Sequence, residues 1–241
     1  MHQNNFTTRM ASLTVLAVAL ALPATATSEP TEESQRLGVG LKAALFVPAA
    51  RTGPGELRVG EASVERAMSW AGALDLLYSP PVLGNALSAR LEAGYSPLAG
   101  VGEASFPADP DFDAFQYSWD QNLIPITLGI HYEQALALPV GSLYLAGGAG
   151  GAVVPLQSVT TYEKDGTSVQ DAPQTAVATG FYAALEMGWR LGPGLVLGEY
   201  RFVLAKTDMN FRETYGGHIN TYAGEVQGSL IRLGYRIDFD I

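Results

Sequence analysis

The stretch that most constrains the fold is the last one, Ser229 to Ile241, which reads SLIRLGYRIDFDI. From position 231 onward its odd positions are apolar, whereas its even positions are polar or glycine. This period-2 alternation predicts a long β-strand with one apolar and one polar face. Soluble strands are usually about five or six residues long, whereas a transmembrane β-strand needs about 9–11 tilted residues. The length of the pattern therefore favours a membrane barrel.

The same alternation recurs along the rest of the chain. We predict further strands at about 36–48, 67–79, 86–97, 119–133, 142–154, 174–190 and 195–206. The pattern leaves open which face of the glycine-rich segment 142–154 points inward. The connections are alternately long and short, and the long ones include the polar stretches 98–116, 155–173 and 207–224, which we predict as loops. Short periplasmic turns and long outside loops are typical of outer-membrane barrels, so we predict an all-β, eight-stranded antiparallel up-and-down transmembrane β-barrel.

The composition agrees with a membrane-embedded chain. Charged residues make up 16% of the 241 residues, below the roughly 25% of ordinary soluble domains. The absence of cysteine excludes a disulfide, a thiolate metal site and a cysteine nucleophile. The formal net charge of −10 argues against nucleic acid as a partner.

The N-terminus has the features of an export signal. Arg9 precedes an apolar run at 11–22 and a small-residue triplet at 24–26. This run is too short to span a bilayer as a helix, and no later apolar stretch reaches the about 18 residues that a helix needs. We therefore predict a secretory signal peptide at 1–26, a periplasmic tail at 27–35 and an outer-membrane barrel at 36–241.

Alternation alone also allows a soluble barrel of lipocalin type, with its apolar face inward. Two features favour apolar side chains on the outside. The polar face is rich in Gly, Ala and Ser, as a narrow barrel interior requires. Aromatic residues lie near predicted strand ends, where the interfacial girdles of membrane barrels occur, at Tyr78, Tyr95, Tyr132, Trp189 and Phe239.

Several segments resemble a known family. They read LIPITLGIHY in the fourth predicted strand, YLAGGAG in the fifth, LGEYRF in the seventh and RLGYRIDF at the end. With these segments the chain resembles the small eight-stranded outer-membrane barrels of the OmpA-like, OmpX-like and opacity-protein group. In such families the last strand carries the assembly signal, which the resemblance places at Arg232, Gly234, Ile237 and Phe239. The chain departs from that pattern because two further residues follow the final aromatic.

The predicted interior face carries charges of both signs. Its members are Lys42, Asp75, Arg90, Glu92, His131, Glu133, Glu186, Arg190, Glu199, Arg201, Arg232 and Arg236. Unpaired charge in a low-dielectric lumen is unfavourable by several kcal/mol, so near balance of the signs predicts a salt-bridged network that fills the barrel. The alternative is a water-filled path for small solutes or ions. An eight-stranded interior is only just wide enough for side chains, which favours the filled barrel.

The histidines do not fit the catalytic pattern of a barrel enzyme. A lipid A deacylase of this shape resembles a serine hydrolase, with a histidine two residues before the serine. Here Glu133 follows His131 at that spacing, and Asn220 follows His218. We expect His131 beside Glu133 to be an interior pair, and we expect no enzyme activity, no catalytic residue and no cofactor.

One acidic cluster deserves separate consideration as a metal site. The carboxylates of Asp109, Asp111 and Asp113 are hard oxygen ligands of the kind that Ca²⁺ prefers. The glycine and the distal bidentate glutamate of a calcium loop are absent, however. We therefore expect a solvated loop and no metal site.

These features together predict a monomeric protein of the bacterial outer membrane with a structural or surface-interaction role through four extracellular loops. A narrow channel for small or apolar solutes is the first alternative, and a lipid-modifying enzyme is the second. The expected partners are outer-membrane lipid, lipopolysaccharide and the assembly machinery that the resemblance implies for the C-terminal strand. The ligand or surface partner does not follow from the sequence.

Overall fold

The computed structural model describes residues 35–48, 61–66, 68–81, 85–105, 115–138, 141–164, 167–170, 172–191, 193–215 and 218–241. The predicted signal peptide, nearly all of the predicted tail and the acidic cluster at 109–113 lie outside these ranges. No helix within the described ranges is long and apolar enough to cross a membrane.

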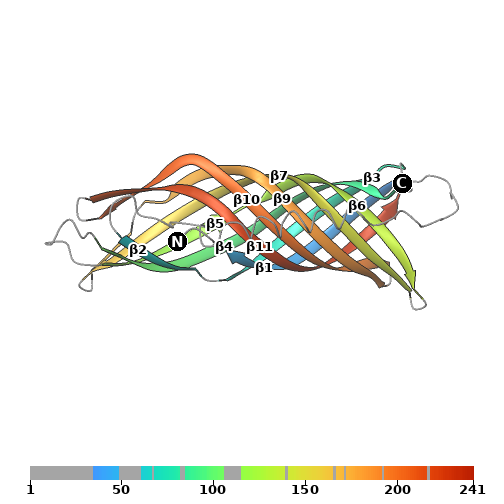
Figure 1. Cartoon of the computed structure of the whole chain (residues 1–241), viewed down its shortest axis with the longest axis horizontal. Coiled ribbons are helices and arrows are strands. Elements are labelled where there is room, and N and C mark those ends of the chain that lie inside the picture. Colours follow the sequence, from blue (N-terminus) through green and yellow to red (C-terminus); the bar gives the residue numbers. More distant parts are fainter. Residues whose placement is uncertain are drawn as a thin grey trace, which may run out of the picture.

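The described residues form one antiparallel sheet that closes on itself (Figure 1). Its strands are β1 (Arg36–Pro48), β2 (Glu61–Arg66), β3 (Ser69–Ser79), β4 (Leu87–Ser105), β5 (Phe115–Leu123), β6 (Ile126–Leu138), β7 (Gly141–Lys164), β8 (Thr167–Gln170), β9 (Gln174–Leu191), β10 (Gly194–Tyr215) and β11 (His218–Asp240). The pairs β2 and β3, β5 and β6, and β8 and β9 each share one position in the wall. Pairing of β1 with β11 closes the barrel. The predicted eight-stranded antiparallel barrel is confirmed.

The register fixes the tilt of the strands. Following paired residues once around the barrel from Leu37 returns to β1 at Val47, a stagger of ten residues (47 minus 37). With eight strands, this stagger corresponds to a tilt of about 40° to the barrel axis. Two residues that pair across neighbouring strands therefore lie at different heights along the barrel axis. Side chains from strands that are not neighbours can thus meet at one level of the lumen.

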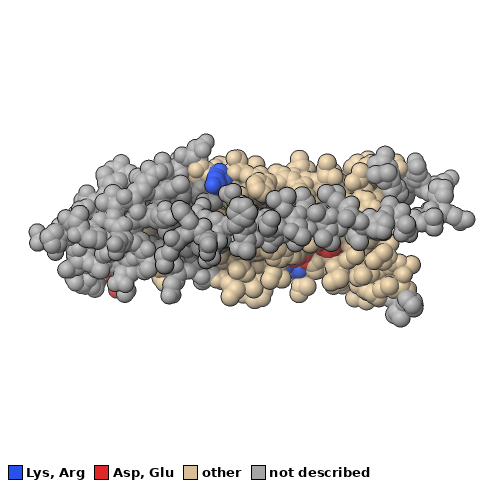
Figure 2. All heavy atoms as spheres, viewed as in Figure 1, with Lys and Arg blue, Asp and Glu red and all other residues tan. Residues whose placement is uncertain are grey.

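The apolar face points outward on the strands whose side chains the structure describes. On β1, Leu41 is 64% exposed whereas its neighbour Lys42 is 2% exposed, and β11 shows the same alternation at Leu233 and Arg232. On the face shown in Figure 2, the described wall is almost wholly uncharged. We call this outward apolar surface the lipid-facing belt. A soluble barrel with an apolar interior face is excluded, because large apolar side chains are exposed around the wall.

Strand β7 resolves the facing that its sequence left open. Ala152 and Val154 are buried inside the barrel, whereas Val153 between them is 44% exposed on the belt. Glycine and alanine occupy both faces of this strand, which is why its pattern carried no facing signal.

Three of the predicted long loops are largely strand, so these predictions were wrong. The stretches 98–116, 155–173 and 207–224 contain the ends of β4, β7 and β10, and the β10–β11 ladder continues to the pair Tyr215 and His218. A strand that projects beyond the membrane has water on its outer face and loses the apolar alternation. These hairpins form what we call the long-hairpin end, at the left of Figure 1, opposite the short-turn end.

Pro125 lies between β5 and β6, which share one position in the wall, and it does not shift their register with β4. Strand β5 ends at Leu123 and β6 begins at Ile126, and the β4 residues paired with them are also three positions apart. The carbonyl of Pro125 accepts a hydrogen bond from the Gly94 amide at 2.9 Å. Pro125 therefore lies without a bulge at a ladder position where no amide donor is needed.

Candidate functional site in the barrel interior

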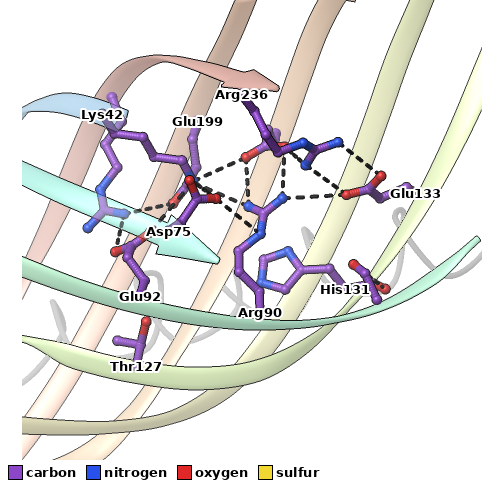
Figure 3. Close-up of polar contacts among 12 residues, drawn as sticks. Lys42, Asp75, Arg90, Glu92, Thr127, His131, Glu133, Glu199 and Arg236 are labelled. Carbon is purple, nitrogen blue, oxygen red and sulfur yellow. Dashed lines mark hydrogen bonds and ion pairs between the residues drawn. The ribbon is translucent and has the colours of Figure 1, made fainter. Parts of the chain in front are cut away.

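Eleven of the twelve residues predicted for the interior face are buried in the lumen. We call this set the charged network: Lys42, Asp75, Arg90, Glu92, His131, Glu133, Glu186, Glu199, Arg201, Arg232 and Arg236. It contains five cationic side chains and five carboxylates, so the ionised network is neutral. Figure 3 shows that these side chains converge from different strands.

Arginine–glutamate pairs connect strands that are not hydrogen-bonded to each other. The bidentate pairs are Arg90 with Glu186, Arg201 with Glu92 and Arg236 with Glu133. Their N–O distances lie between 2.7 and 3.2 Å. They join β4 to β9, β10 to β4 and β11 to β6, so each pair spans the lumen. We call them the cross-lumen braces, and their bidentate, charge-assisted geometry is the strongest kind of side-chain hydrogen bonding.

The ammonium of Lys42 lies among four carboxylates. Its Nζ atom is 2.5 Å from Glu199 and 3.3 Å from Glu186, with Asp75 at 3.5 Å and Glu92 at 3.6 Å. One flexible cation thus compensates the carboxylates that the arginines do not fully neutralise. Removal of this single charge would leave a local excess of buried negative charge.

His131 is a packed member of the interior. Its Nε2 atom lies 3.0 Å from the Tyr182 hydroxyl, and the Arg201 guanidinium lies over the Tyr182 ring at 4.4 Å from the centroid. The imidazole covers Gly148, where a Cβ atom would lie 2.4 Å from the ring. The expected pairing of His131 with Glu133 is wrong, since the hydrogen-bond partner of the imidazole is Tyr182. Glu133 instead binds Arg236.

Arg190 does not belong to the charged network, although it was predicted there. Its side chain is exposed at the short-turn end, where Nε and Nη2 donate to the Tyr144 hydroxyl at 3.3 and 3.2 Å. Arg190 shares the inward face of β9 with Glu186, but it lies four residues closer to the end of the strand. Its guanidinium therefore reaches the mouth of the barrel.

Two residues that the sequence reasoning missed extend the network to this mouth. Arg36 binds Glu133 at 2.5 Å and the Ser79 hydroxyl at 3.1 Å. Asp238 lies 2.9 Å from Nε of Arg236. Both residues occupy the inward parity of their strands, so the alternation contained a signal for them.

A second interior region begins where the charged network ends. We call it the apolar collar: Phe46, Leu98, Trp119, Leu123, Val154, Leu156, Val203, Val226 and Leu230. These side chains, each at most 5% exposed, form one cluster together with small alanines and Tyr182. Along β1, Lys42 is followed by Phe46 in the direction of the long hairpins, which places the collar on that side. The sequence reasoning missed it because Leu98 and Leu156 lie in stretches predicted as loops, and because apolar side chains were expected on the outer face alone.

The predicted assembly-signal residues divide between the two faces of β11. Arg232 is buried in the network, and Gly234 leaves room for Lys42, since a Cβ there would lie 2.7 Å from Cγ of that lysine. Phe239 is 49% exposed on the belt and Ile237 is half-buried. In the folded barrel, only the outward half of the signal is therefore accessible.

The interior contains no candidate for a metal centre within the described part of the chain, where no group of three or more His, Asp or Glu side chains has suitable geometry. The charged side chains of the network form ion pairs with one another instead. The lumen thus holds paired charges at one level and mainly apolar side chains at the next.

Comparison with known proteins identifies the fold. No protein-family model matches the chain, and no curated protein matches it. Among solved structures, the outer membrane protein OprG from Pseudomonas aeruginosa has a TM-score of 0.52 at 14% identity, over 86% of this chain and 97% of OprG. Neisserial surface protein A has a TM-score of 0.42 at 12% identity, over 85% of this chain and 97% of that chain. The attachment invasion locus protein Ail of Yersinia pestis has 0.41 at 9% identity, over 86% and 99%.

At such identities the likeness to OprG concerns the fold alone. The apolar exterior supplies the independent physical argument, because only lipid can cover so much exposed apolar wall. This chain is a small eight-stranded β-barrel of the bacterial outer membrane.

Proposed function

We propose that the protein is a closed, non-conducting barrel that serves as a membrane scaffold and acts through its long-hairpin end, and that it is not an enzyme. The observation that supports this proposal is the filling of the lumen by two successive layers of buried side chains. The first layer is the charged network and the second is the apolar collar.

The charged network opposes an aqueous path. None of its ten charged side chains is more than 5% exposed. Opening a path through it requires separation of buried ion pairs, and breaking one such pair by loss of a partner costs about 3–5 kcal/mol.

The apolar collar opposes ions for a different reason. Apolar constrictions exclude water, and an ion that enters one loses its hydration without gaining a partner. An ion would therefore have to cross a barrier in each layer.

The long hairpins supply the surface for interaction. The β10–β11 ladder continues to Tyr215 and His218, and β7 continues to Lys164. Such paired strands form a more ordered platform than loose loops would. We propose that this end is extracellular and that the barrel is monomeric, with lipopolysaccharide among its contacts, and that the assembly machinery recognises β11.

Single-channel recording tests the closed barrel. The mature protein would be refolded, inserted in a planar bilayer and recorded over a range of salt concentrations, with circular dichroism to establish folding. We expect a silent bilayer. A matched variant, Glu92→Ala with Arg201→Ala, removes one brace but leaves the collar in place, so it should also be silent. Discrete, reproducible openings of the unaltered protein would sink the proposal.

Shortening the β10–β11 hairpin tests the surface role. Removal of residues 210–223 takes away the upper ladder and leaves the network and the collar in place. We expect the shortened protein to refold and cells that produce it to lose adherence or aggregation that depends on the protein. Truncation of the β7–β8 hairpin is the matched control. Unchanged surface behaviour in both variants would contradict a role for this end.

The collar favours a second candidate function, passage of small apolar solutes. Apolar walls accept such solutes, and passage would also require a gap in the charged network beneath. Uptake of a small apolar solute by proteoliposomes tests this candidate, with Leu98→Arg as the blocking variant. Uptake that Leu98→Arg does not change would exclude the collar as its route.

A further inference from the structure

The pairing of β1 with β11 is the step that closes the wall. Thirteen residue pairs join the two strands, from Arg36 with Asp240 to Pro48 with Gly228. We call this pairing the closing seam. If the seam alone slipped by two residues, the stagger of ten would become eight or twelve (10 − 2 or 10 + 2). The tilt and width of the barrel would change with it.

Neither the backbone nor the lipid-facing belt prevents such a slip. A slip of one residue would turn every apolar side chain of a strand into the lumen, but a slip of two residues keeps each side chain on its own face. The ladder hydrogen bonds can form again after a slip of two, because the antiparallel pattern repeats every two residues. The outward residues at positions 39–45 and 231–237 are all apolar or aromatic, so the slip would exchange one apolar contact for another.

The inward face of the closing seam is more specific. Lys42 pairs with Gly234, where a Cβ atom would lie only 2.7 Å from Cγ of the lysine. The lysine side chain crosses β11 at this glycine and reaches β10, where its Nζ atom is 2.5 Å from Glu199 (Figure 3). Gly234 therefore provides the gap through which Lys42 joins β1 to the second strand along.

The inward neighbours of Gly234 on β11 are both arginines. Arg232 and Arg236 lie two residues to either side of it, and each pairs with an alanine or a glycine of β1. A slip of two residues would therefore place Lys42 directly opposite Arg232 in one direction and Arg236 in the other. Like charges directly opposite each other are destabilising, and the low dielectric of a buried lumen strengthens the repulsion. In either slip an arginine would also occupy the place where the lysine now crosses.

We propose that Lys42, Gly234 and the two flanking arginines fix the register in which the barrel closes. The glycine accepts the lysine in one register, and the arginines oppose it in the two nearest registers that keep the belt apolar. The charged network thus has a second role beside filling the lumen, since it selects the width of the wall that surrounds it.

Disulfide trapping tests this role, because the chain has no native cysteine. Val47→Cys would be combined in turn with Gln227→Cys, Ser229→Cys or Ile231→Cys, all on the outward parity of their strands. Val47 pairs with Ser229, so only that combination should bridge in the native register. The diagonal positions are about 7–8 Å away, which is too far for a disulfide. Each protein would be refolded in detergent while reduced and then oxidised, and the bridged chains would be measured on an unreduced denaturing gel.

The test variant is Lys42→Ala with Glu199→Gln, which removes one cation and one carboxylate and so leaves the network neutral. Arg90→Ala with Glu186→Gln is the matched control, because it removes one brace between β4 and β9 and also keeps the network neutral. We expect bridging at 227 and 231 to rise several-fold in the test variant and to stay at the level of the unaltered protein in the control. Bridging at 229 alone in the test variant would overturn the proposal, as would equal slippage in the control.

A variant of one arginine makes the test directional. Arg232→Ala with Glu92→Gln is also neutral, and it removes the obstacle to only one of the two slips. We expect bridging to rise at 227 and not at 231. A rise at 231 of the same size would contradict the proposal, and this variant decides the question if the Lys42 variant does not refold. Circular dichroism verifies folding of each variant before oxidation.

Discussion

The charged network and the apolar collar fill the same lumen by opposite means. The network uses directional contacts, in which each guanidinium meets a named carboxylate from another part of the wall. The collar uses side chains of suitable volume without directional bonds, from Phe46 at the end of β1 to Leu230 of β11. Both regions fill the lumen with buried side chains.

The two regions should differ in how they tolerate a substitution. A buried ion pair that loses one member leaves an uncompensated charge, and the structure cannot remove that charge by small shifts. An apolar cluster that loses a side chain leaves a cavity, which neighbouring side chains partly fill. The network should therefore be brittle, in the sense that loss of one charge strongly lowers the free energy of unfolding. In the collar, the loss of free energy should grow with the side-chain volume that is removed.

The largest effect is expected from the network. Glu92→Ala removes a carboxylate that binds Arg201 through both oxygens and also contacts Arg232. We expect a loss of about 3–5 kcal/mol in the free energy of unfolding, measured by urea titration of the refolded barrel. The outward neighbour Leu91→Ala is the control and should lose far less. A loss below about 1 kcal/mol for Glu92→Ala would mean that the network is not brittle.

The collar should show the next largest effect. Leu98, which is 2% exposed, packs within the cluster, so Leu98→Ala should lower the free energy of unfolding by about 3 kcal/mol through the cavity that it creates. The nearly volume-conserving Leu98→Met should lose less than about 1.5 kcal/mol. Equal losses for these two variants would show that volume does not govern this region.

A smaller effect is expected where the wall makes room for the network. Gly148→Ala places a Cβ 2.4 Å from the His131 ring, which must then shift, and we expect a loss of about 1–3 kcal/mol in the free energy of unfolding. Gly151 of the same strand faces outward with its nearest atom at 4.0 Å, so Gly151→Ala should be close to neutral. The same urea titration measures both, and a neutral Gly148→Ala would refute tight packing around His131.

The smallest effect should come from the arginine outside the network. Arg190 is exposed, and its side chain contacts that of Tyr144. Arg190→Ala should change the free energy of unfolding by less than about 1 kcal/mol, as exposed charged contacts usually do. Arg90→Ala, inside the network, is the matched comparison. Similar losses for the two arginines would erase the distinction between mouth and lumen.

The local alternation pattern predicted which residues face the lumen, but it did not predict which of them form ion pairs with each other. Period-2 alternation identified inward positions such as Lys42, Glu92 and Arg201, because a side chain's face depends only on its own strand. Alternation could not show that Glu92 meets Arg201, since β4 and β10 come together only through the closed barrel. It also failed at the projecting hairpins, where water replaces lipid and the apolar face is no longer required.

Three properties can be predicted from the sequence alone: that the chain forms a membrane barrel, how many strands the wall has and which face of most strands meets lipid. These properties follow from alternation, strand length and connection length, all of which are local. The depth of each inward residue along the barrel axis follows from the closed barrel and not from the sequence pattern. This depth places Arg190 at the mouth and brings together the cross-lumen braces and the apolar collar. Depth depends on the ten-residue stagger, which every strand pair contributes to and no single stretch encodes.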